Sequence, residues 1–319
     1  MSLTANAQDP WVVYEGQAGV GQGKHLVFVT GDDEYRSEEG MPMLAELLAK
    51  RHGFTCTVLF AIDPADGTIK PDHQRNVPGT HLLADADLMV IFLRFRELPD
   101  SQMKPIIDFV NSGKPIVALR TATHSFRYAE NLDSPYAKYD WQSKEPLGGF
   151  GRLVLGDTWV NHHGKHKQES TRGVINREFA QHPILRGVED VWGPTDVYGI
   201  THLAKTDQVL MFGQVLVGMS PSDPPVEGEK NNPMMPLAWV RNYTGASGKT
   251  SRVFATTMGA SVDLQSTGLR RLLVNACYWG LGLEEHIDGR ANVDYVRPYK
   301  PTFYGFGEYQ KGLTPSDFR

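Results

Sequence analysis

Residues 113–126, with the sequence GKPIVALRTATHSF, decide the fold. Gly113 follows an apolar helical pattern that ends at Val110, and glycine is typical of the position just past a helix end. Pro115–Leu119 are apolar throughout, which is the pattern of a strand buried on both faces of a parallel sheet. From Arg120 on, the side chains become mostly polar. We therefore predict a buried parallel strand whose carboxyl end opens onto a polar loop.

The same alternation of apolar strands and helical periods extends in both directions from this segment. Before it we expect strands at His25–Thr30, Phe54–Ala61 and Asp87–Leu93, and helices over residues 37–48 and 103–110. After it we expect strands at Val191–Ile200, Val209–Val217, Leu237–Arg241 and Arg252–Thr257, then a helix over residues 269–280. Repeated strand-helix units predict an α/β fold with a doubly wound, mostly parallel sheet, to which later β strands are added.

Composition and charge exclude several classes of protein. The chain has 319 residues and a net charge of −5 without a long basic stripe, so we expect no nucleic-acid partner. Its two cysteines, Cys56 and Cys277, lie in apolar patterns and are expected to be buried thiols rather than a disulfide or a metal framework. No apolar run reaches the roughly 18 residues that span a bilayer, so we expect no membrane span.

The ends of the chain differ from the centre. Ala5-Asn6-Ala7 has the small-x-small form found beside a signal-peptidase cut, which favours export to the periplasm or beyond, while a cytoplasmic start with the same residues is the alternative. The tail has aromatic residues and prolines but no periodicity. We therefore divide the chain into a leader or export remnant (1–23), one α/β domain (24–283) and an extended C-terminal tail (284–319).

Two glycine-rich stretches resemble nucleotide-binding loops but stand in the wrong context. Gly19–Gly23 precedes the first predicted strand, whereas a phosphate loop must follow a strand and open a helix. Gly245–Thr250 ends like a Walker loop, but Tyr243 occupies the position of the first glycine and a strand follows. We predict a flexible leader for the first stretch and a hairpin turn for the second.

Polar side chains gather where the predicted strands end. In open α/β sheets, ligands bind outside the carboxyl ends of the strands. Three of these ends supply Asp32, Asp33, Glu34 and Arg36, then Arg94, and finally Arg120, Thr121 and His124. This convergence predicts a pocket for a small polar ligand. Solvated helix caps and structural ion pairs are the alternative explanation for the same residues.

A histidine cluster forms a second candidate site. His162, His163 and His166 fall within five residues of one predicted loop. His162 and His166 could bind a divalent metal together with a carboxylate, although Gly164 disfavours a helix there. One of the three could instead act as a general acid or base over the pocket, because imidazole titrates near neutrality. Ordinary surface histidines remain the third possibility.

Several motifs together carry a family resemblance. They are the segment 113–126, PLAWV at 236–240 with RVFATTMG at 252–259, and GDDEYR at 31–36 with DVY at 196–198. This set resembles the ThuA-like (trehalose-utilisation) family, a branch of the class I glutamine amidotransferase-like superfamily. The resemblance covers roughly residues 24–283 and implies a flavodoxin-like sheet.

Departures from the superfamily pattern limit the chemistry. The amidotransferases carry a nucleophilic cysteine at the sharp turn after the central strand, where this chain has Arg120. We therefore expect no glutamine hydrolysis by that route. ThuA-like relatives commonly have histidine at the Arg120 position and again where this chain has Ala260, so a mechanism built on those two histidines is not carried over.

The resulting hypothesis is a pocket for a small carbohydrate-derived ligand, with hydrolysis, elimination or isomerisation of a sugar or keto-sugar as its chemistry. A histidine or carboxylate would transfer a proton while Arg120 stabilises negative charge on oxygen. The expected catalytic residues are Glu34, Arg120, His124 and His163. The expected ligand-binding residues are Asp32, Asp33, Arg36, Arg94, Thr121, His162, Asp196, Tyr198 and Gly259. No cofactor is assigned beyond a divalent metal at His162 and His166, a homo-oligomer stays open, and the competing hypothesis is a non-catalytic sugar- or metal-binding module.

Overall fold

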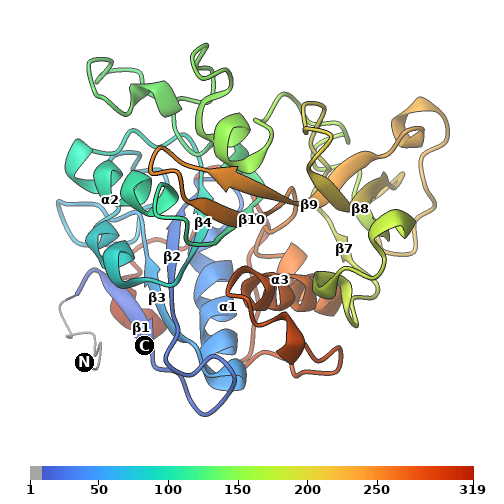
Figure 1. Cartoon of the computed structure of the whole chain (residues 1–319), viewed down its shortest axis with the longest axis horizontal. Helices are drawn as coiled ribbons and strands as arrows, with labels where there is room; N and C mark the ends of the chain where they lie inside the picture. Colours follow the sequence, from blue (N-terminus) through green and yellow to red (C-terminus); the bar gives the residue numbers. More distant parts are fainter. Residues whose placement is uncertain (1–8) are drawn as a thin grey trace.

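The computed structural model describes residues 9–319, and a ten-stranded sheet runs through this part of the chain (Figure 1). Its strand order is β1-β3-β2-β4-β5-β10-β9-β8-β6-β7. The strands are β1 Trp11–Tyr14, β2 His25–Gly31, β3 Thr55–Leu59, β4 Leu88–Leu93, β5 Ile116–Leu119, β6 Thr171–Ile175, β7 Trp192–Gly193, β8 Gln208–Val215, β9 Met235–Thr244 and β10 Thr250–Thr256. The α-helices in the described part are α1 Ser37–His52, α2 Asp100–Val110 and α3 Thr267–Gly280.

One half of the sheet is parallel and the other antiparallel. β2 pairs in parallel with β3 on one side and β4 on the other, and the parallel pairing continues through β5 to β10. Because the chain winds outward in both directions from β2, this half is the doubly wound, flavodoxin-like α/β arrangement that was predicted. Beyond β10 the sheet continues antiparallel through β9, β8, β6 and β7.

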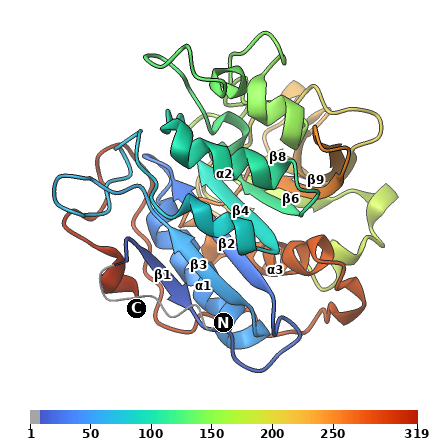
Figure 2. The same ribbon diagram turned by 60° about the vertical axis from the view of Figure 1, so that its left-hand side comes forward.

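Helices cover both faces of the parallel half. Helices α1 and α3 lie against one face, and α2 lies against the other (Figures 1 and 2). Side chains of β2 alternate accordingly, since Leu26 and Phe28 pack into the core under α1 and α3 while Val27 and Val29 pack into the core under α2. A strand buried on both faces has no polar side, and burial of each such side chain contributes about 1.5–3 kcal/mol.

Local sequence signals fix where the helices begin and end. Helix α1 ends at Gly53, which has a φ of 85° and caps the helix through its N–H. A Cβ atom at this position would lie 2.9 Å from the backbone of Gly19, so glycine also lets the N-terminal segment pack closely. Helix α3 begins after Ser266, whose hydroxyl accepts the backbone N–H of Leu269.

The prediction of a strand over Val191–Ile200 is wrong for most of its length. Only Trp192–Gly193 pair as a strand. Pro194 follows and has no N–H to donate to a neighbouring strand. The next residue, Thr195, donates its hydroxyl to the carboxylate of Asp263 at 2.7 Å, so the segment is held by side chains rather than by a ladder.

Strand β1 was not anticipated. It lies inside the segment expected to be a flexible leader and pairs antiparallel with the edge strand β3, Trp11 opposite Leu59. Its four residues are too few to show a clear alternation of polar and apolar side chains. The Ala5–Ala7 motif on which export was predicted lies outside the described residues.

Several smaller predictions are confirmed. Residues 245–248 form the turn of the β9–β10 hairpin, closed by the Gly245 N–H to the Lys249 carbonyl at 3.1 Å. Cys56 and Cys277 are free and buried. Within residues 9–319, no helix has the length and apolarity needed to cross a membrane.

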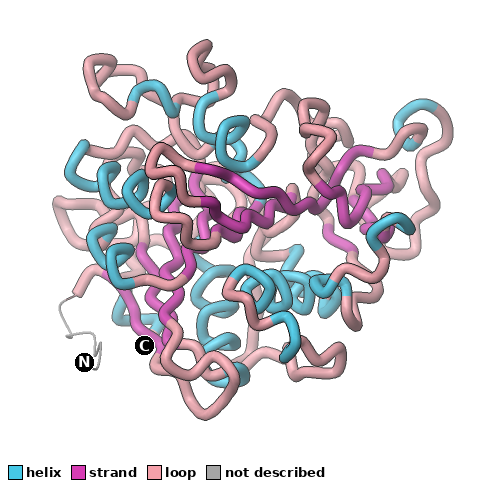
Figure 3. The backbone as a smooth tube through the Cα atoms, in the orientation of Figure 1, coloured by secondary structure: helices cyan, strands magenta, loops and turns pink. Residues whose placement is uncertain are grey.

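The segment after α3 runs along the surface and contains only short helical turns, at Glu284–His286 and Pro315–Phe318. Figure 3 shows how much of the chain lies outside helices and strands. The segment passes the start of α1, where Thr302 donates its N–H to Glu39 at 2.7 Å. It ends beside β1, where the hydroxyl of Tyr14 donates to the carbonyl of Phe318.

Candidate functional site

The loop after β2 is organised around a buried carboxylate, Asp32. This carboxylate accepts the N–H groups of Glu34 (2.8 Å) and Tyr35, and the hydroxyl of Thr121 at 2.5 Å. Burial raises the pKa of Asp32. Asp32 and Thr121 were expected to bind ligand, but here they join the loops after β2 and β5 to each other.

Arg120 occupies the sharp turn after β5, with a φ of 43°. Its guanidinium lies between the rings of Tyr35 and Tyr198, 4.3 and 4.1 Å from their centres. It donates to the carbonyls of Asp196 (2.6 Å) and Thr257 (2.7 Å) and pairs with the Asp196 carboxylate at 3.3 Å. Because Arg120 is completely buried, it cannot touch a ligand in this arrangement, which differs from the catalytic contact expected of it. It positions Asp196 instead.

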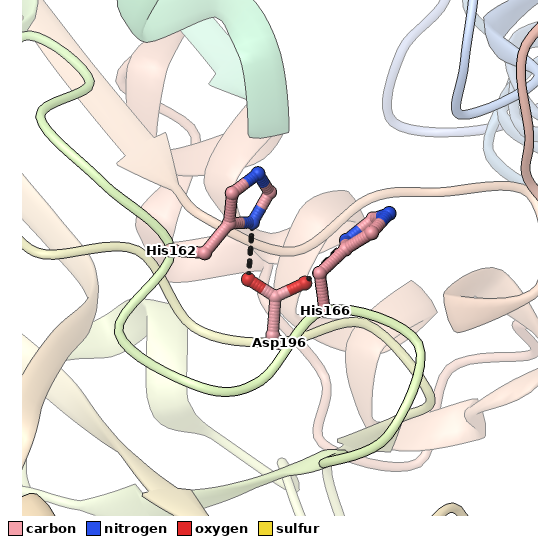
Figure 4. Close-up of side chains that lie close together, drawn as sticks. All are labelled: His162, His166 and Asp196. Atoms are coloured by element: carbon pink, nitrogen blue, oxygen red, sulfur yellow. Dashed lines mark hydrogen bonds and ion pairs between the residues drawn. The ribbon is translucent and has the colours of Figure 1, made fainter.

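Asp196 is the centre of the candidate site (Figure 4). One carboxylate oxygen lies 2.6 Å from Nδ1 of His162 and the other lies 3.0 Å from Nδ1 of His166. Burial alone would raise the pKa of Asp196, but Arg120 and the two histidine hydrogen bonds outweigh it and hold that pKa well below its usual range. A permanently ionised carboxylate therefore orients two imidazole rings.

His166 bridges two carboxylates. Its Nε2 lies 3.0 Å from Glu34, while Nδ1 faces Asp196. The hydrogen bonds to Asp196 and Glu34 raise the pKa of His166 to about 9. At neutral pH the ring is therefore an imidazolium, and both of its N–H groups are used inside the protein.

Glu34 connects this pair of histidines to an arginine that is not fully buried. Burial would raise the pKa of Glu34, but the hydrogen bond from His166 and the charge of Arg94 lower it. Arg94 lies 3.8 Å from Glu34 and 2.9 Å from Asp33. A cavity of about 620 Å³ opens beside it, lined by Asp33, Asp72, His73, Gln74, Arg75, Arg94, Phe95, Glu97, Arg127 and Ala129. Its volume is in the range of small-molecule sites.

Aromatic rings form the wall between this cavity and the histidines. The His124 ring lies 4.9 Å from Phe95 and 5.4 Å from Trp159, and Trp159 in turn lies 5.7 Å from His162. Burial lowers the pKa of His124 well below its usual range. His124 is thus a neutral ring in an aromatic stack. Tyr198 completes the wall, 5.4 Å from His162.

The same groups could hold a metal ion. Donor atoms of His162, His166 and Asp196 all lie within 4.8 Å of one another. Two imidazoles and one carboxylate suit zinc and other divalent transition metals. The pair His162 and His166 was predicted for this purpose, and Asp196 is the carboxylate that the prediction lacked. A metal would have to replace the proton that His166 carries.

Comparison with known proteins places the fold in a family. A family model described as "ThuA: Trehalose utilisation" matches residues 24–280. The chain belongs to the ThuA family. No curated protein matches it significantly.

Solved structures share the fold of this ThuA-family protein at low identity. A ThuA-like protein from Parabacteroides merdae is 12% identical with a TM-score of 0.50, over 93% of this chain and 99% of the other. A ThuA-like protein from Bacteroides uniformis is 13% identical with a TM-score of 0.48, over 83% and 94%. The glutaminase domain of Trypanosoma brucei CTPS, with bound acivicin, is 9% identical with a TM-score of 0.37, over 88% and 98%.

Three expected site residues of this ThuA-family protein point elsewhere. His163, expected to be catalytic, bonds through Nε2 to the backbone carbonyl of Lys230 at 2.7 Å. Arg36 is fully buried and donates to the carbonyl of Gly305 at 2.6 Å. Gly259 donates its N–H to Asp263 at 3.0 Å. The first follows the histidine loop outward, and the other two hold the fold together.

No thiol lies at the turn that Arg120 occupies. Cys56 is in β3 and Cys277 in α3, and burial raises the pKa of both thiols, that of Cys277 to about 12. A buried neutral thiol is a poor nucleophile. The expectation that this chain lacks the amidotransferase cysteine agrees with this placement.

Two contributors were missed by the sequence reasoning. Trp159 lies in the loop just before the histidine cluster, and Tyr304 lies in the tail with its ring 5.5 Å from His166. The concentration of aromatic residues in a tail without periodicity was the available signal. Their burial could not be inferred, because it depends on where the tail runs.

Proposed function

We propose that this ThuA-family protein binds a small carbohydrate-derived ligand, a sugar or keto-sugar, and moves a proton on it with His162 as the general base. The observation that supports this most is the hydrogen bond between Nδ1 of His162 and the buried carboxylate of Asp196, 2.6 Å long. A carboxylate in this position holds the proton on Nδ1 and leaves the lone pair on Nε2.

The free nitrogen of His162 is accessible. Nε2 points away from Asp196 (Figure 4), and within residues 9–319 it makes no hydrogen bond. About a third of the side chain is exposed. His166 cannot play this part, because both of its ring nitrogens contact carboxylates. The two histidines therefore divide the work, one reactive and one holding positive charge in place.

The proton transfer is an enolisation step. Nε2 of His162 takes a proton from the carbon next to the ketone of a keto-sugar, the C–H electron pair becomes a carbon–carbon double bond, and the ketone oxygen takes the negative charge. Arg94, with 16% of its side chain exposed, is the cation placed to stabilise that oxygen, in place of the buried Arg120. Elimination and isomerisation both begin from this intermediate.

The second candidate is a metal-binding module without catalysis. Its support is the placement of the donor atoms of His162, His166 and Asp196 within 4.8 Å of one another. A bound divalent ion would occupy Nδ1 of both histidines and leave no oriented base. The two candidates use the same residues and exclude one another at the level of His162.

Two measurements separate the candidates. The first is a thermal-shift panel of trehalose, glucose, fructose, a mono-ketone derivative of trehalose, Zn²⁺, Mn²⁺ and Co²⁺. The second follows deuterium uptake by NMR at the carbon next to the ketone in D₂O, with the full chain. We expect stabilisation by the ketone derivative and deuterium uptake that His162→Gln abolishes and His163→Gln does not. Stabilisation by metals with no uptake from any ketone would favour the binding module, and no response to any sugar would refute the carbohydrate proposal.

A further inference from the structure

A short stretch of the tail, Thr302–Phe306, contacts the site although it lies beyond the residues matched by the family model. We call it the arm. Gly305 donates its N–H to the carbonyl of Glu34 at 2.8 Å, and Arg36 donates to the carbonyl of Gly305 at 2.6 Å. Arg36 also donates to the hydroxyl of Thr302 at 3.2 Å. The arm is therefore fixed to the loop that carries Glu34.

One aromatic residue of the arm supports the histidines from behind. Tyr304 is completely buried, and its ring lies 5.2 Å from Tyr35 and 5.5 Å from His166. Its hydroxyl donates to the carbonyl of Pro194 at 3.1 Å. Because Tyr304 anchors the centre of the arm, the residues on either side of it have fixed positions.

The two phenylalanines of the arm are exposed, but only one of them lies beside the polar groups of the site. Phe303 is 47% exposed and stacks on Tyr304 at 4.3 Å. Phe306 is 58% exposed, and its ring centre lies 4.9 Å from the guanidinium of Arg94. Arg94 pairs with Asp33, and both line the cavity of about 620 Å³.

This combination suits a sugar ring. A pyranose presents a face of C–H groups that packs on an aromatic ring, and a rim of hydroxyls that needs charged donors and acceptors. Phe306 offers the aromatic ring, Arg94 the donors and Asp33 the acceptors. An open-chain ligand has hydroxyls but no flat apolar face, so Phe306 would distinguish the two.

We propose that the arm forms a binding subsite for the ring of a cyclic sugar, with Phe306 against its apolar face and the Arg94–Asp33 pair on its hydroxyls. This inference rests on the proposed function, because it assumes a sugar ligand at the same site. It assigns ligand selection to a part of the chain outside the family model, and leaves proton transfer to His162.

The test compares a cyclic with an acyclic ligand. Dissociation constants are measured by calorimetry for the mono-ketone derivative of trehalose and for 1,3-dihydroxyacetone, using the full chain and its variants. Phe306→Ala should lower the preference for the cyclic ligand about threefold to tenfold, as expected for the loss of one aromatic contact. Phe306→Trp, which keeps an aromatic face, should restore the preference.

Phe303→Ala is the matched control, because Phe303 is similarly exposed on the same segment and does not contact Arg94. It should leave the preference unchanged. An unchanged preference in Phe306→Ala, or an equal loss in both phenylalanine variants, would overturn the subsite while leaving the proton-transfer proposal standing. Failure of both ligands to bind the wild-type chain would overturn both proposals together.

Discussion

The strand-end loops of the parallel half and the histidine loop of the antiparallel half both carry charged side chains, yet they use them differently. Asp32, Arg36 and Arg120, in the first region, are completely buried and bond to other parts of the chain. His162 and His166, in the second, keep about a third of their side chains exposed. The contrast teaches that charge at a strand end is not itself evidence of a ligand contact. In this protein the first region holds the second in position.

The largest effect is expected from removing the cation that links the two regions. Arg120→Leu leaves Asp196 buried without its arginine, which should lower the free energy of unfolding by about 3–5 kcal/mol. Urea denaturation measures it. Arg127→Leu, a change at an exposed arginine, should stay within about 0.5 kcal/mol. A similar small loss in both variants would contradict the supporting role of Arg120.

The next effect concerns the histidine loop alone. His162→Gln should reduce deuterium exchange into the keto-sugar by roughly 10²–10⁴-fold, because the general base is lost. Its thermal stability should change little, since the side chain is partly exposed and Asp196 retains Arg120 and His166. His163→Gln serves as the matched control and should exchange at the wild-type rate. Equal losses in both variants would refute the assignment of the base.

A smaller, pH-dependent effect tests the bridge between Glu34 and Asp196. The pKa of His166 is raised from 6.5 to about 9, so its contribution to stability is complete below about pH 6.5 and disappears as the pH rises through about 9. The melting temperature of the wild type should therefore fall between pH 7 and pH 10 by more than that of His166→Gln. Parallel melting curves over this range would show that the imidazolium does not stabilise the fold.

The smallest effect is expected far from the site. Ser266→Ala removes the N-terminal cap of α3 and should cost about 1 kcal/mol of unfolding free energy. Deuterium exchange should stay at the wild-type rate, because the cap contacts neither histidine. A loss of exchange beyond what the fraction of folded protein explains would mean that the scaffold and the site are coupled more closely than we infer.

The fold was predictable because its decisive strands are apolar along their whole length. Pro115–Leu119 and His25–Thr30 are examples, and both are strands in the structure. Strand β1 escaped prediction since four edge residues carry little pattern, and Val191–Ile200 was overpredicted since side-chain bonds to Asp263 replace strand pairing there.

The candidate site was less accessible to prediction, because it depends on direction as well as position. His162 and His163 are neighbours in a loop without periodicity, and nothing in their sequence says which one turns toward Asp196. Arg120 was located at the correct turn, but its enclosure by Tyr35 and Tyr198 joins residues 85 and 78 positions apart from it. Such contacts exist only after the chain has folded.

The attachment of the arm bears on how ligand preference could diversify among related proteins. The sheet, the three α-helices and the histidine loop all lie at or before residue 280, whereas Phe306 follows in a segment that contributes no strand to the sheet. Substitutions in the arm can therefore accumulate without disturbing strand register or helix packing. Natural selection would have in this tail an interchangeable part, through which one ancestral scaffold could serve many sugars.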